Sequence, residues 1–293
     1  STMDPMLFPW IADHKVGGLA VFPAAGYVEV LMAVAREVHG DGALELREMD
    51  IVRPLVFDGN TTCETLVRYA AETGIVEFLS RPRGGGTDWA TNARGIVSRS
   101  PASEGKGWAE SESGPIIVPR AKVYEISRTL GFEYGPSFQR VRHVSFPEAK
   151  LAVAALEQNG TVAIAGQTID ITALDAAFHS LFASEEAGVA DMPMKRMLPV
   201  RFGRVRAFAP GRVASRTIAR TQYASPKLGS RLMAMSASSI VRAKLPSSQV
   251  ERATYRWYSP LVMSRPIARS KWAGASAVRP RANEMRPMKY EGS

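Results

Sequence analysis

Two stretches of the chain place apolar residues at three- and four-residue steps, the spacing that gathers them on one face of an α-helix. The first stretch follows Pro23 and ends near Gly40, a common stop signal. The second follows Asp170 and ends before Gly188. We therefore expect two helices. Their apolar positions are Val28, Leu31, Met32, Ala35 and Val38 in the first, and Leu174, Phe178, Leu181 and Phe182 in the second.

Short segments rich in β-branched and apolar residues surround both expected helices and predict strands. Four follow the first helix, two precede the second and three follow it. In chain order they are residues 44–57, 61–71, 75–80, 89–98, 152–156, 162–164, 198–209, 214–223 and 231–243.

One long helix followed by antiparallel strands, repeated twice, predicts an α+β protein of two fused hot-dog units, each a sheet wrapped around one helix. Turn-forming residues accumulate at 100–107 and mark the join. We expect an N-terminal half at 1–100, a linker at 101–115 and a C-terminal half at 116–250. Residues 251–293 would be a C-terminal linker or the start of a following region.

Composition restricts the class of protein. The 293 residues are 45% hydrophobic, which excludes a disordered chain. No run of about 18 apolar residues exists that could span a membrane. The lone cysteine, Cys63, cannot form an internal disulfide and favours a reducing, cytoplasmic location.

The net charge of +9 is unevenly distributed. Residues 1–191 hold 16 basic and 25 acidic side chains, whereas residues 192–250 hold 12 basic side chains and no acidic one. The basic stretch from Lys195 to Lys244 could attract an acidic partner, or it could simply form solvated strand faces. No nucleic-acid-reading motif accompanies it, so nucleic acid is not expected as a partner.

Histidine, the first choice for acid–base chemistry near neutral pH, occurs only four times. One copy begins the pattern His-x-x-x-Gly-x-x-x-x-Pro, formed by His14, Gly18 and Pro23. A glycine there lets the backbone approach a ligand, and its amide could donate to a carbonyl oxygen. By itself the pattern is a weak signal, because an isolated histidine beside Asp13 and Lys15 is usually an exposed turn residue.

Asp175 and His179 are four residues apart on the second expected helix and therefore share a face. The alternative is structural, because Thr172-x-x-Asp175 also matches a capping arrangement at a helix start. A third segment, Tyr134-Gly135-Pro136, is a turn signal that displays a phenol.

Together and in this order, the three segments resemble the dehydratase domains of modular polyketide synthases. The resemblance spans about residues 8–245 and includes Leu198-Pro199-Val200. The chain departs from the family pattern at Glu133, where a glycine is usual, and at Ala24, where Pro-Gly-Ala is usual. Fewer residues than usual precede the histidine.

The resemblance implies that the chain removes water from a β-hydroxyacyl thioester on an acyl carrier protein, giving an enoyl thioester for polyketide biosynthesis. His14 would be the base and Asp175 the acid, kept protonated by an apolar pocket. An amide near Gly18 would polarise the thioester carbonyl. The residues that orient the substrate or shape the site would be Tyr134, His179, Gly18, Pro23, Gly135 and Pro136.

The resemblance further implies that neither a metal nor an organic cofactor is needed beyond the carrier's phosphopantetheine. The expected partners are the acyl carrier protein and other polyketide synthase domains, with a homodimer as an option and no membrane or nucleic acid. Arg201, Arg204 and Arg206, in the basic stretch, are candidates for docking the acidic carrier.

Three other functions on the same fold stay open: an enoyl isomerase that shifts a double bond, a catalytically silent domain that binds the carrier, and a thioesterase. An isomerase can dispense with the acid, so the presence of Asp175 counts against it. The Tyr134-Gly135-Pro136 turn and the fused two-helix layout favour elimination over hydrolysis.

Overall fold

The computed structural model describes residues 1–58, 62–101, 114–148, 151–157, 167–188, 196, 198–208, 217–222 and 242–243. They belong to one structural unit, Ser1–Val262, while a second unit, Met263–Ser293, lies outside the described residues. The predicted linker at 101–115 lies almost entirely outside them too, and the predicted region at 251–293 entirely so. The domain boundaries therefore stay predictions.

Both expected helices are confirmed. The first is α1 (Ala24–His39), which begins after Pro23 and ends at Gly40. The second is α3 (Ile171–His179), and it continues into a 3-10 turn (Ser180–Phe182) and the short α4 (Ala183–Glu186).

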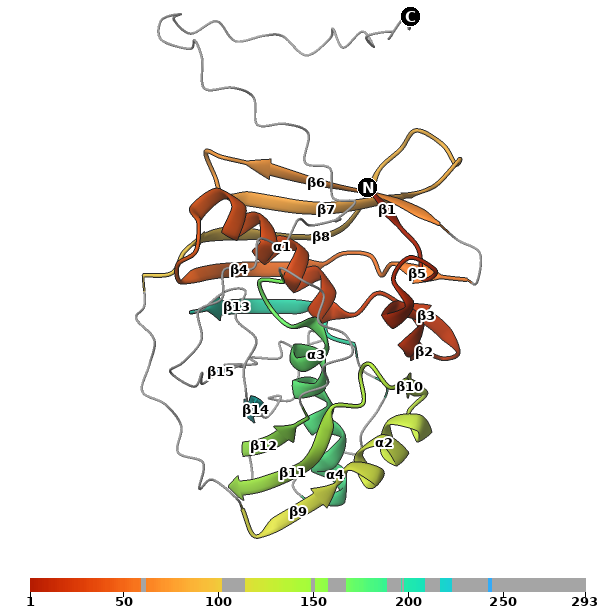
Figure 1. Ribbon diagram of the computed structural model, residues 1–293, viewed down its shortest axis with the longest axis vertical. Helices are drawn as coiled ribbons and strands as arrows, with labels where there is room; N and C mark the ends of the chain where they lie inside the picture. Colours follow the sequence, from red (N-terminus) through yellow and green to blue (C-terminus); the bar gives the residue numbers. More distant parts are fainter. Residues whose placement is uncertain are drawn as a thin grey trace, which may run out of the picture. The chain divides into compact units, whose positions relative to one another are not determined.

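A six-stranded antiparallel sheet is covered on one face by α1, which contacts its central strands β4, β7 and β8 (Figure 1). In spatial order the strands are β1 (Thr2–Met3), β6 (Cys63–Ala70), β7 (Ile75–Pro82), β8 (Ala90–Arg99), β4 (Leu44–Ile51) and β13 (Arg201–Ala207). Strand β13 comes from the expected C-terminal half, yet it pairs with β4 of the N-terminal half. The two halves therefore share this sheet.

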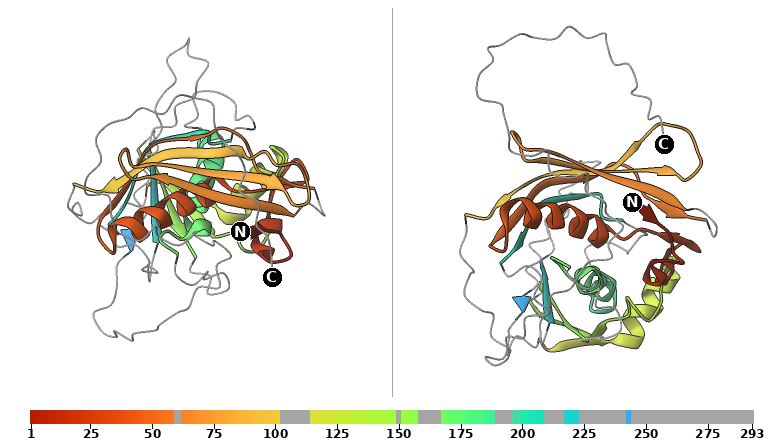
Figure 2. Two further views of the ribbon diagram at one scale, coloured as in Figure 1. Left: turned by 90° about the horizontal axis from the view of Figure 1, so that it is seen from above. Right: turned by 45° about the horizontal axis from the view of Figure 1, so that its top comes forward.

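A second sheet holds α3, which contacts β11, β12 and β14. In spatial order its strands are β15 (Arg242–Ala243), β14 (Thr217–Gln222), β12 (Leu151–Leu156), β11 (Val141–Glu148) and β9 (Ile116–Pro119). Because α1 and α3 also contact each other, the layers follow the order sheet, helix, helix, sheet (Figure 2). The predicted double hot-dog is confirmed.

A small four-stranded sheet joins the halves in the order β10 (Phe132–Tyr134), β2 (His14–Val16), β3 (Leu19–Val21) and β5 (Val56–Phe57). The single strand expected at 44–57 is thus wrong, because β4 and β5 belong to different sheets. Pro54 lies in the break, and proline cannot donate a hydrogen bond to a sheet.

Two helical segments were not expected from the sequence: the 3-10 helix Pro9–Asp13 and α2 (Arg120–Thr129). Only three residues of α2 are buried and most of its residues are polar, so few apolar positions mark this helix in the sequence. The strand expected at 162–164 lies outside the described residues.

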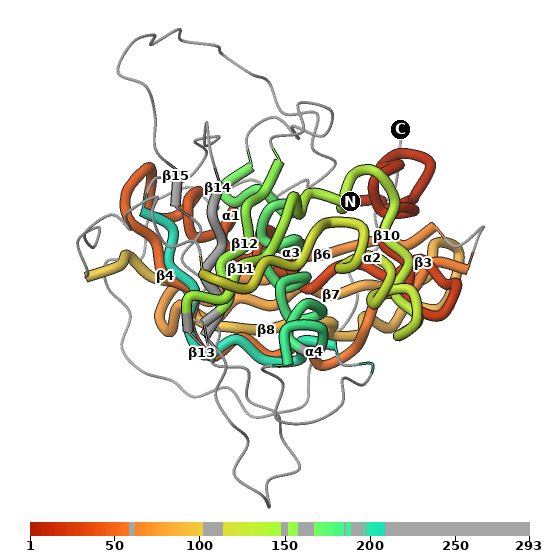
Figure 3. The backbone as a smooth tube through the Cα atoms, turned by 90° about the horizontal axis from the view of Figure 1, so that it is seen from below, coloured from red at the N-terminus to blue at the C-terminus, as the bar shows by residue number. Residues whose placement is uncertain are grey.

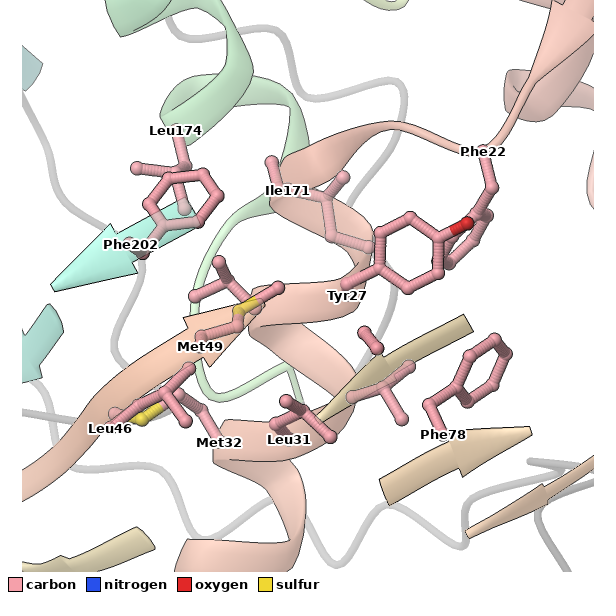
Figure 4. Packing of buried hydrophobic residues seen from close by; sticks show 14 of the residues in the cluster. Phe22, Tyr27, Leu31, Met32, Leu46, Met49, Phe78, Ile171, Leu174 and Phe202 are labelled. Atoms are coloured by element: carbon pink, nitrogen blue, oxygen red, sulfur yellow. The ribbon is translucent and has the colours of Figure 1, made fainter. Parts of the chain in front are cut away.

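The core between the layers is built from large side chains of α1. Tyr27, Leu31 and Met32 lie against the sheet residues Leu46, Met49 and Phe78, as Figure 4 shows. Ile171 and Leu174 of α3 belong to the same cluster, so the two helices share a core. No helix in the described part of the chain is long and apolar enough to cross a membrane.

Candidate active site

His14 opens strand β2 and is held by the hairpin that β2 forms with β3. The two residues of the hairpin turn, Gly17 and Gly18, have φ angles of +61° and +83°, a conformation that glycine adopts without steric cost. The turn places the His14 ring beside the Val21 carbonyl, to which Nδ1–H donates at 2.9 Å. Since Nδ1 carries the proton, Nε2 keeps a free lone pair, as a base requires.

Asp175 lies opposite this lone pair. Its Oδ1 is 3.7 Å from His14 Nε2, and its Oδ2 accepts a hydrogen bond of 2.9 Å from His179 Nε2. His14 is 5% exposed and Asp175 4%, so the exposed-turn alternative for His14 is wrong. Burial lowers the pKa of His14, and the charge of Asp175 partly opposes this shift.

The capping alternative for Asp175 is also wrong. Asp170 is the residue that caps α3, because its side chain accepts a 3.0 Å hydrogen bond from the Ala173 amide. The buried Arg140 holds this cap through a 2.5 Å ion pair with Asp170 and a 2.8 Å hydrogen bond to Thr172. The Asp175 carboxyl is therefore free of the helix start and points into the site.

The Tyr134-Gly135-Pro136 turn reaches the site through strand pairing. Strand β10 runs antiparallel to β2, which makes Tyr134 the direct cross-strand partner of His14. The Tyr134 ring lies on His179, with 4.0 Å between ring centroids. Burial raises the pKa of Tyr134 well above its usual value, so its hydroxyl keeps its proton.

Asp13, the residue before His14, fastens this turn to the hairpin. Its carbonyl accepts from the Gly135 amide at 2.7 Å, and its carboxylate accepts from the Ser137 amide at 3.0 Å. A Cβ at position 135 would overlap the Asp13 carboxylate, so the turn needs glycine there. The Gly-Pro part of the motif thus sets backbone geometry, while the tyrosine faces the site.

A cavity of about 230 Å³ opens onto His14 and Asp175. His179 and Tyr134 also line it, and the rest of its wall is mostly apolar, including Phe132, Phe178, Leu181 and Phe182. Val52, Leu198 and Val200 line the cavity as well, and each is more than 40% exposed, which places them at its mouth. Within the described residues, no group of three His, Cys, Asp or Glu side chains could hold a metal ion.

The predicted role of Gly18 needs correction. Gly18 is exposed at the tip of the hairpin and does not line the cavity, because the turn carries it away from His14. Pro23 stands at the N-cap of α1, and the following residue, Ala24, does line the cavity. The first amides of a helix have no partner within the helix, so the start of α1 is the better donor toward a carbonyl oxygen.

The three arginines predicted to dock a carrier lie on β13 beside acidic residues of β4. The ion pairs join Arg201 to Glu48 and Asp50, and Arg204 and Arg206 to Glu45. Their charge is therefore compensated within the sheet. Docking by these residues stays a prediction, and the ion pairs weaken it. Lys195 and Lys244, which bound the basic stretch, lie outside the described residues.

Two buried residues that join distant segments carried no signal in the sequence. Glu29 of α1 accepts hydrogen bonds from the Thr168 and Ile169 amides at 2.8 and 2.6 Å, which ties α1 to the segment leading into α3. Tyr124 of α2 contacts His179. Neither belongs to a local motif, and only the packing of distant segments gives them these partners.

Models of two protein families match the chain. One, described as a polyketide synthase dehydratase domain, covers residues 1–81, and the other, described as a polyketide synthase dehydratase N-terminal domain, covers residues 106–233. A phenolphthiocerol/phthiocerol polyketide synthase of Mycobacterium tuberculosis is 29% identical over 216 residues, 68% of this chain. The chain spans only 11% of that protein's length, and 4% of the Mycobacterium tuberculosis mycoketide-CoA synthase.

Solved structures share the fold. The dehydratase domain from the CurF module of curacin polyketide synthase has a TM-score of 0.65 at 19% identity, covering 78% of this chain and 82% of that one. Two CurK dehydratase structures, also 19% identical, have TM-scores of 0.64 and 0.62 and cover 78% of this chain and 81% of theirs. One carries a histidine-to-phenylalanine change and the other an aspartate-to-asparagine change, and both are described as inactive mutants.

Taken with the double hot-dog and the meeting of all three sequence motifs in one apolar cavity, the two family models establish that the chain belongs to the dehydratase domains of polyketide synthases.

Proposed function

We propose that the chain dehydrates a β-hydroxyacyl thioester, carried on the phosphopantetheine of an acyl carrier protein, to the α,β-unsaturated thioester. The observation that carries this proposal is the 3.7 Å separation of His14 Nε2 and Asp175 Oδ1 at one apolar cavity. A base and an acid so close can act on neighbouring carbons of one substrate.

In the proposed reaction, His14 Nε2 takes the α-proton, and the electron pair of the broken C–H bond forms the Cα–Cβ double bond. The Cβ–O bond breaks as Asp175 gives its proton to the departing hydroxyl, which leaves as water. Negative charge develops on the thioester oxygen during this step. In this proposal the amide of Ala24, at the positive end of the α1 dipole and on the cavity wall, stabilises that charge.

His179 and Tyr134 complete the site in this proposal. His179 holds Oδ2 of Asp175, so that Oδ1 faces the substrate. The Tyr134 hydroxyl makes no hydrogen bond to a described residue and is free to bind the leaving oxygen. The apolar wall suits an acyl chain, and the chemistry asks for no metal or organic cofactor.

The residue types inactivated in the two CurK dehydratases, a histidine and an aspartate, are those we assign as base and acid. These relatives share the fold at low identity, so they support the assignment by analogy only.

A synthetic β-hydroxyacyl pantetheine thioester tests the function directly. We expect the chain to form the enoyl thioester, measured by liquid chromatography and mass spectrometry. His14→Phe should lower the rate by about 10²–10⁴-fold, because it removes the general base. His143→Phe, on β11 and outside the cavity lining, is the matched control and should keep the wild-type rate.

Other products would contradict the proposal. Release of the free acid would indicate a thioesterase, and migration of a double bond in an enoyl substrate without hydration would indicate an isomerase. If wild type leaves every thioester unchanged, a silent carrier-binding domain becomes the better description. Near-wild-type dehydration by His14→Phe would remove His14 as the base.

A further inference from the structure

Tyr124 is a buried residue of α2 that the proposed reaction does not use. Helix α2 lies beside β10, as the view from below in Figure 3 shows, and it contacts the 3-10 turn and α4 that follow α3. The Tyr124 side chain is 3% exposed, and its hydroxyl meets three polar groups. These are the Val141 amide at 3.0 Å, the Phe138 carbonyl at 3.2 Å and Nδ1 of His179 at 3.3 Å.

The hydroxyl has one proton to donate. Burial raises the pKa of Tyr124, so the phenol stays neutral. It accepts from the Val141 amide, which leaves the Phe138 carbonyl and His179 Nδ1 as alternative acceptors. The Phe138 carbonyl already accepts one hydrogen bond, from the Arg140 amide at 2.8 Å. Nδ1 of His179 has no other donor among the described residues, so we take Nδ1 as the acceptor of the Tyr124 proton.

Donation to Nδ1 decides where His179 carries its own proton. A neutral imidazole has one N–H, and when Nδ1 accepts, that N–H is on Nε2. Nε2 is 2.9 Å from Asp175 Oδ2, so it donates to that oxygen. The proton of the Asp175 acid is then left with Oδ1, the oxygen that faces His14 and the cavity.

We propose that Tyr124 is a positioning residue that acts through His179: its hydroxyl holds His179 in the Nε2–H form and so keeps the transferable proton of Asp175 on the oxygen facing the substrate. The hydrogen-bonded order is Val141 amide, Tyr124, His179, Asp175. This inference rests on the proposed function, because it assigns Asp175 the role of the acid.

Without the Tyr124 hydroxyl the opposite arrangement competes. His179 can carry its proton on Nδ1, and its bare Nε2 then accepts from a proton on Asp175 Oδ2. In that arrangement the acid proton points away from the cavity, and the departing hydroxyl receives none. The substrate still binds, because Tyr124 does not line the cavity.

The experiment is nitrogen NMR of the chain labelled with ¹⁵N-histidine. The His179 ring signals are identified by their loss in His179→Asn. In wild type we expect a protonated Nε2 and an accepting Nδ1. In Tyr124→Phe we expect a mixture of the two tautomers, together with a fall in kcat of roughly tenfold or more and a KM within about twofold of wild type.

Ser127→Ala is the matched control for damage to α2. Ser127 is buried on the same helix and donates to the Tyr124 carbonyl at 3.0 Å, so its loss perturbs the helix without touching His179. We expect this variant to keep the wild-type His179 tautomer and kcat. If both variants lower kcat equally and neither changes the tautomer, the role of Tyr124 is only structural and the proposal fails.

The wild-type spectrum is itself decisive, even if Tyr124→Phe does not fold. A wild-type His179 protonated on Nδ1 overturns the proposal. The spectrum does not depend on turnover, so its outcome is separate from that of the dehydration assay. An active wild type with the wrong tautomer overturns only the role of Tyr124, whereas the expected tautomer in a chain that does not dehydrate overturns only the proposed function.

Discussion

The two halves of the molecule hold their reactive groups in different ways. His14 is fixed by main chain, through the β2–β3 hairpin and the Val21 carbonyl. Asp175 is fixed by side chains, through His179 and, behind it, Tyr124. The position of a base held by the backbone should change little when neighbouring side chains are replaced. The position of an acid held by side chains depends on each of them, here His179 and Tyr124.

The two central helices, α1 and α3, differ in how much of their surface is buried. Ten of the sixteen residues of α1 are buried, and its other residues meet solvent or are half-buried. All nine residues of α3 are buried, because a sheet packs on one side of it and α1 on another. Polar groups on a helix with no solvent face must find partners inside the protein. This explains why Asp175 and His179 bond each other.

The largest expected effect distinguishes the step that needs His14 from the step that needs Asp175. With a β-hydroxyacyl thioester in deuterated water, His14→Phe should lose both α-proton exchange and dehydration, by about 10²–10⁴-fold. Asp175→Asn should lose dehydration by a similar factor yet keep α-proton exchange, because removing the α-proton needs only the base. Mass spectrometry of recovered substrate measures exchange, and product analysis measures dehydration.

The comparison fails if the two variants behave alike. Loss of exchange in Asp175→Asn would mean that the carboxyl is needed to form the enolate, so the halves would not divide the reaction. Undiminished dehydration by Asp175→Asn would remove the acid role altogether. The wild-type chain measured in the same solvent provides the reference rates.

A smaller effect tests the packing difference. Leu31 of α1 is fully buried against the six-stranded sheet (Figure 4), and Leu31→Ala should lower the free energy of unfolding by about 2–5 kcal/mol, because it leaves a cavity. Ala176 of α3 is fully buried in the second core, beside Ala152 and Ala154. Ala176→Leu should cost about 1–3 kcal/mol through overpacking. Urea denaturation measures both.

The losses of activity should follow the opposite order to the losses of stability, with Ala176→Leu more damaging than Leu31→Ala. Ala176 is adjacent to Asp175, so overpacking there displaces the acid. The cavity left by Leu31→Ala lies within a core that holds neither reactive group. We expect Leu31→Ala to keep a wild-type kcat below its unfolding transition and Ala176→Leu to lose activity. A greater loss of kcat in Leu31→Ala would show that the first core, too, positions the site.

Local patterns in the sequence were enough for the two helices and for the longer strands of the six-stranded sheet. Six strands match no expected segment: β1, β2, β3, β9, β10 and β11. The helix periodicities predicted α1 and α3 because each has a long run of buried positions. The pairing of β10 with β2 could not be predicted in this way. Both strands have three residues, too few to show a period, and their partners are far apart in the chain.

Polar residues showed the same limit. Thr172-x-x-Asp175 matched a capping pattern, but the helix begins at Ile171, and Asp170 is the residue at the cap. The register of β13 against β4 sets Arg206 opposite Glu45, so an apparently unopposed basic stretch is partly neutralised by acids from the other half. Such pairings depend on tertiary contacts, which a single sequence does not contain.

The smallest expected effect concerns the pH dependence of the reaction, which follows from the protonation of His14 in one half beside Asp175 in the other. His14 must be neutral to act as a base, so kcat/KM should fall as the pH drops through its pKa. Burial disfavours the imidazolium and places that pKa below the ordinary 6.5. Asparagine, like the protonated acid that the proposed reaction requires, carries no charge, so the acidic limb of α-proton exchange in Asp175→Asn should stay within about one pH unit of the wild-type limb. A wild-type acidic limb at or above 6.5, or a larger displacement in the variant, would contradict this pairing of a neutral base with a neutral acid, because the burial that lowers the pKa of His14 is the same in both proteins.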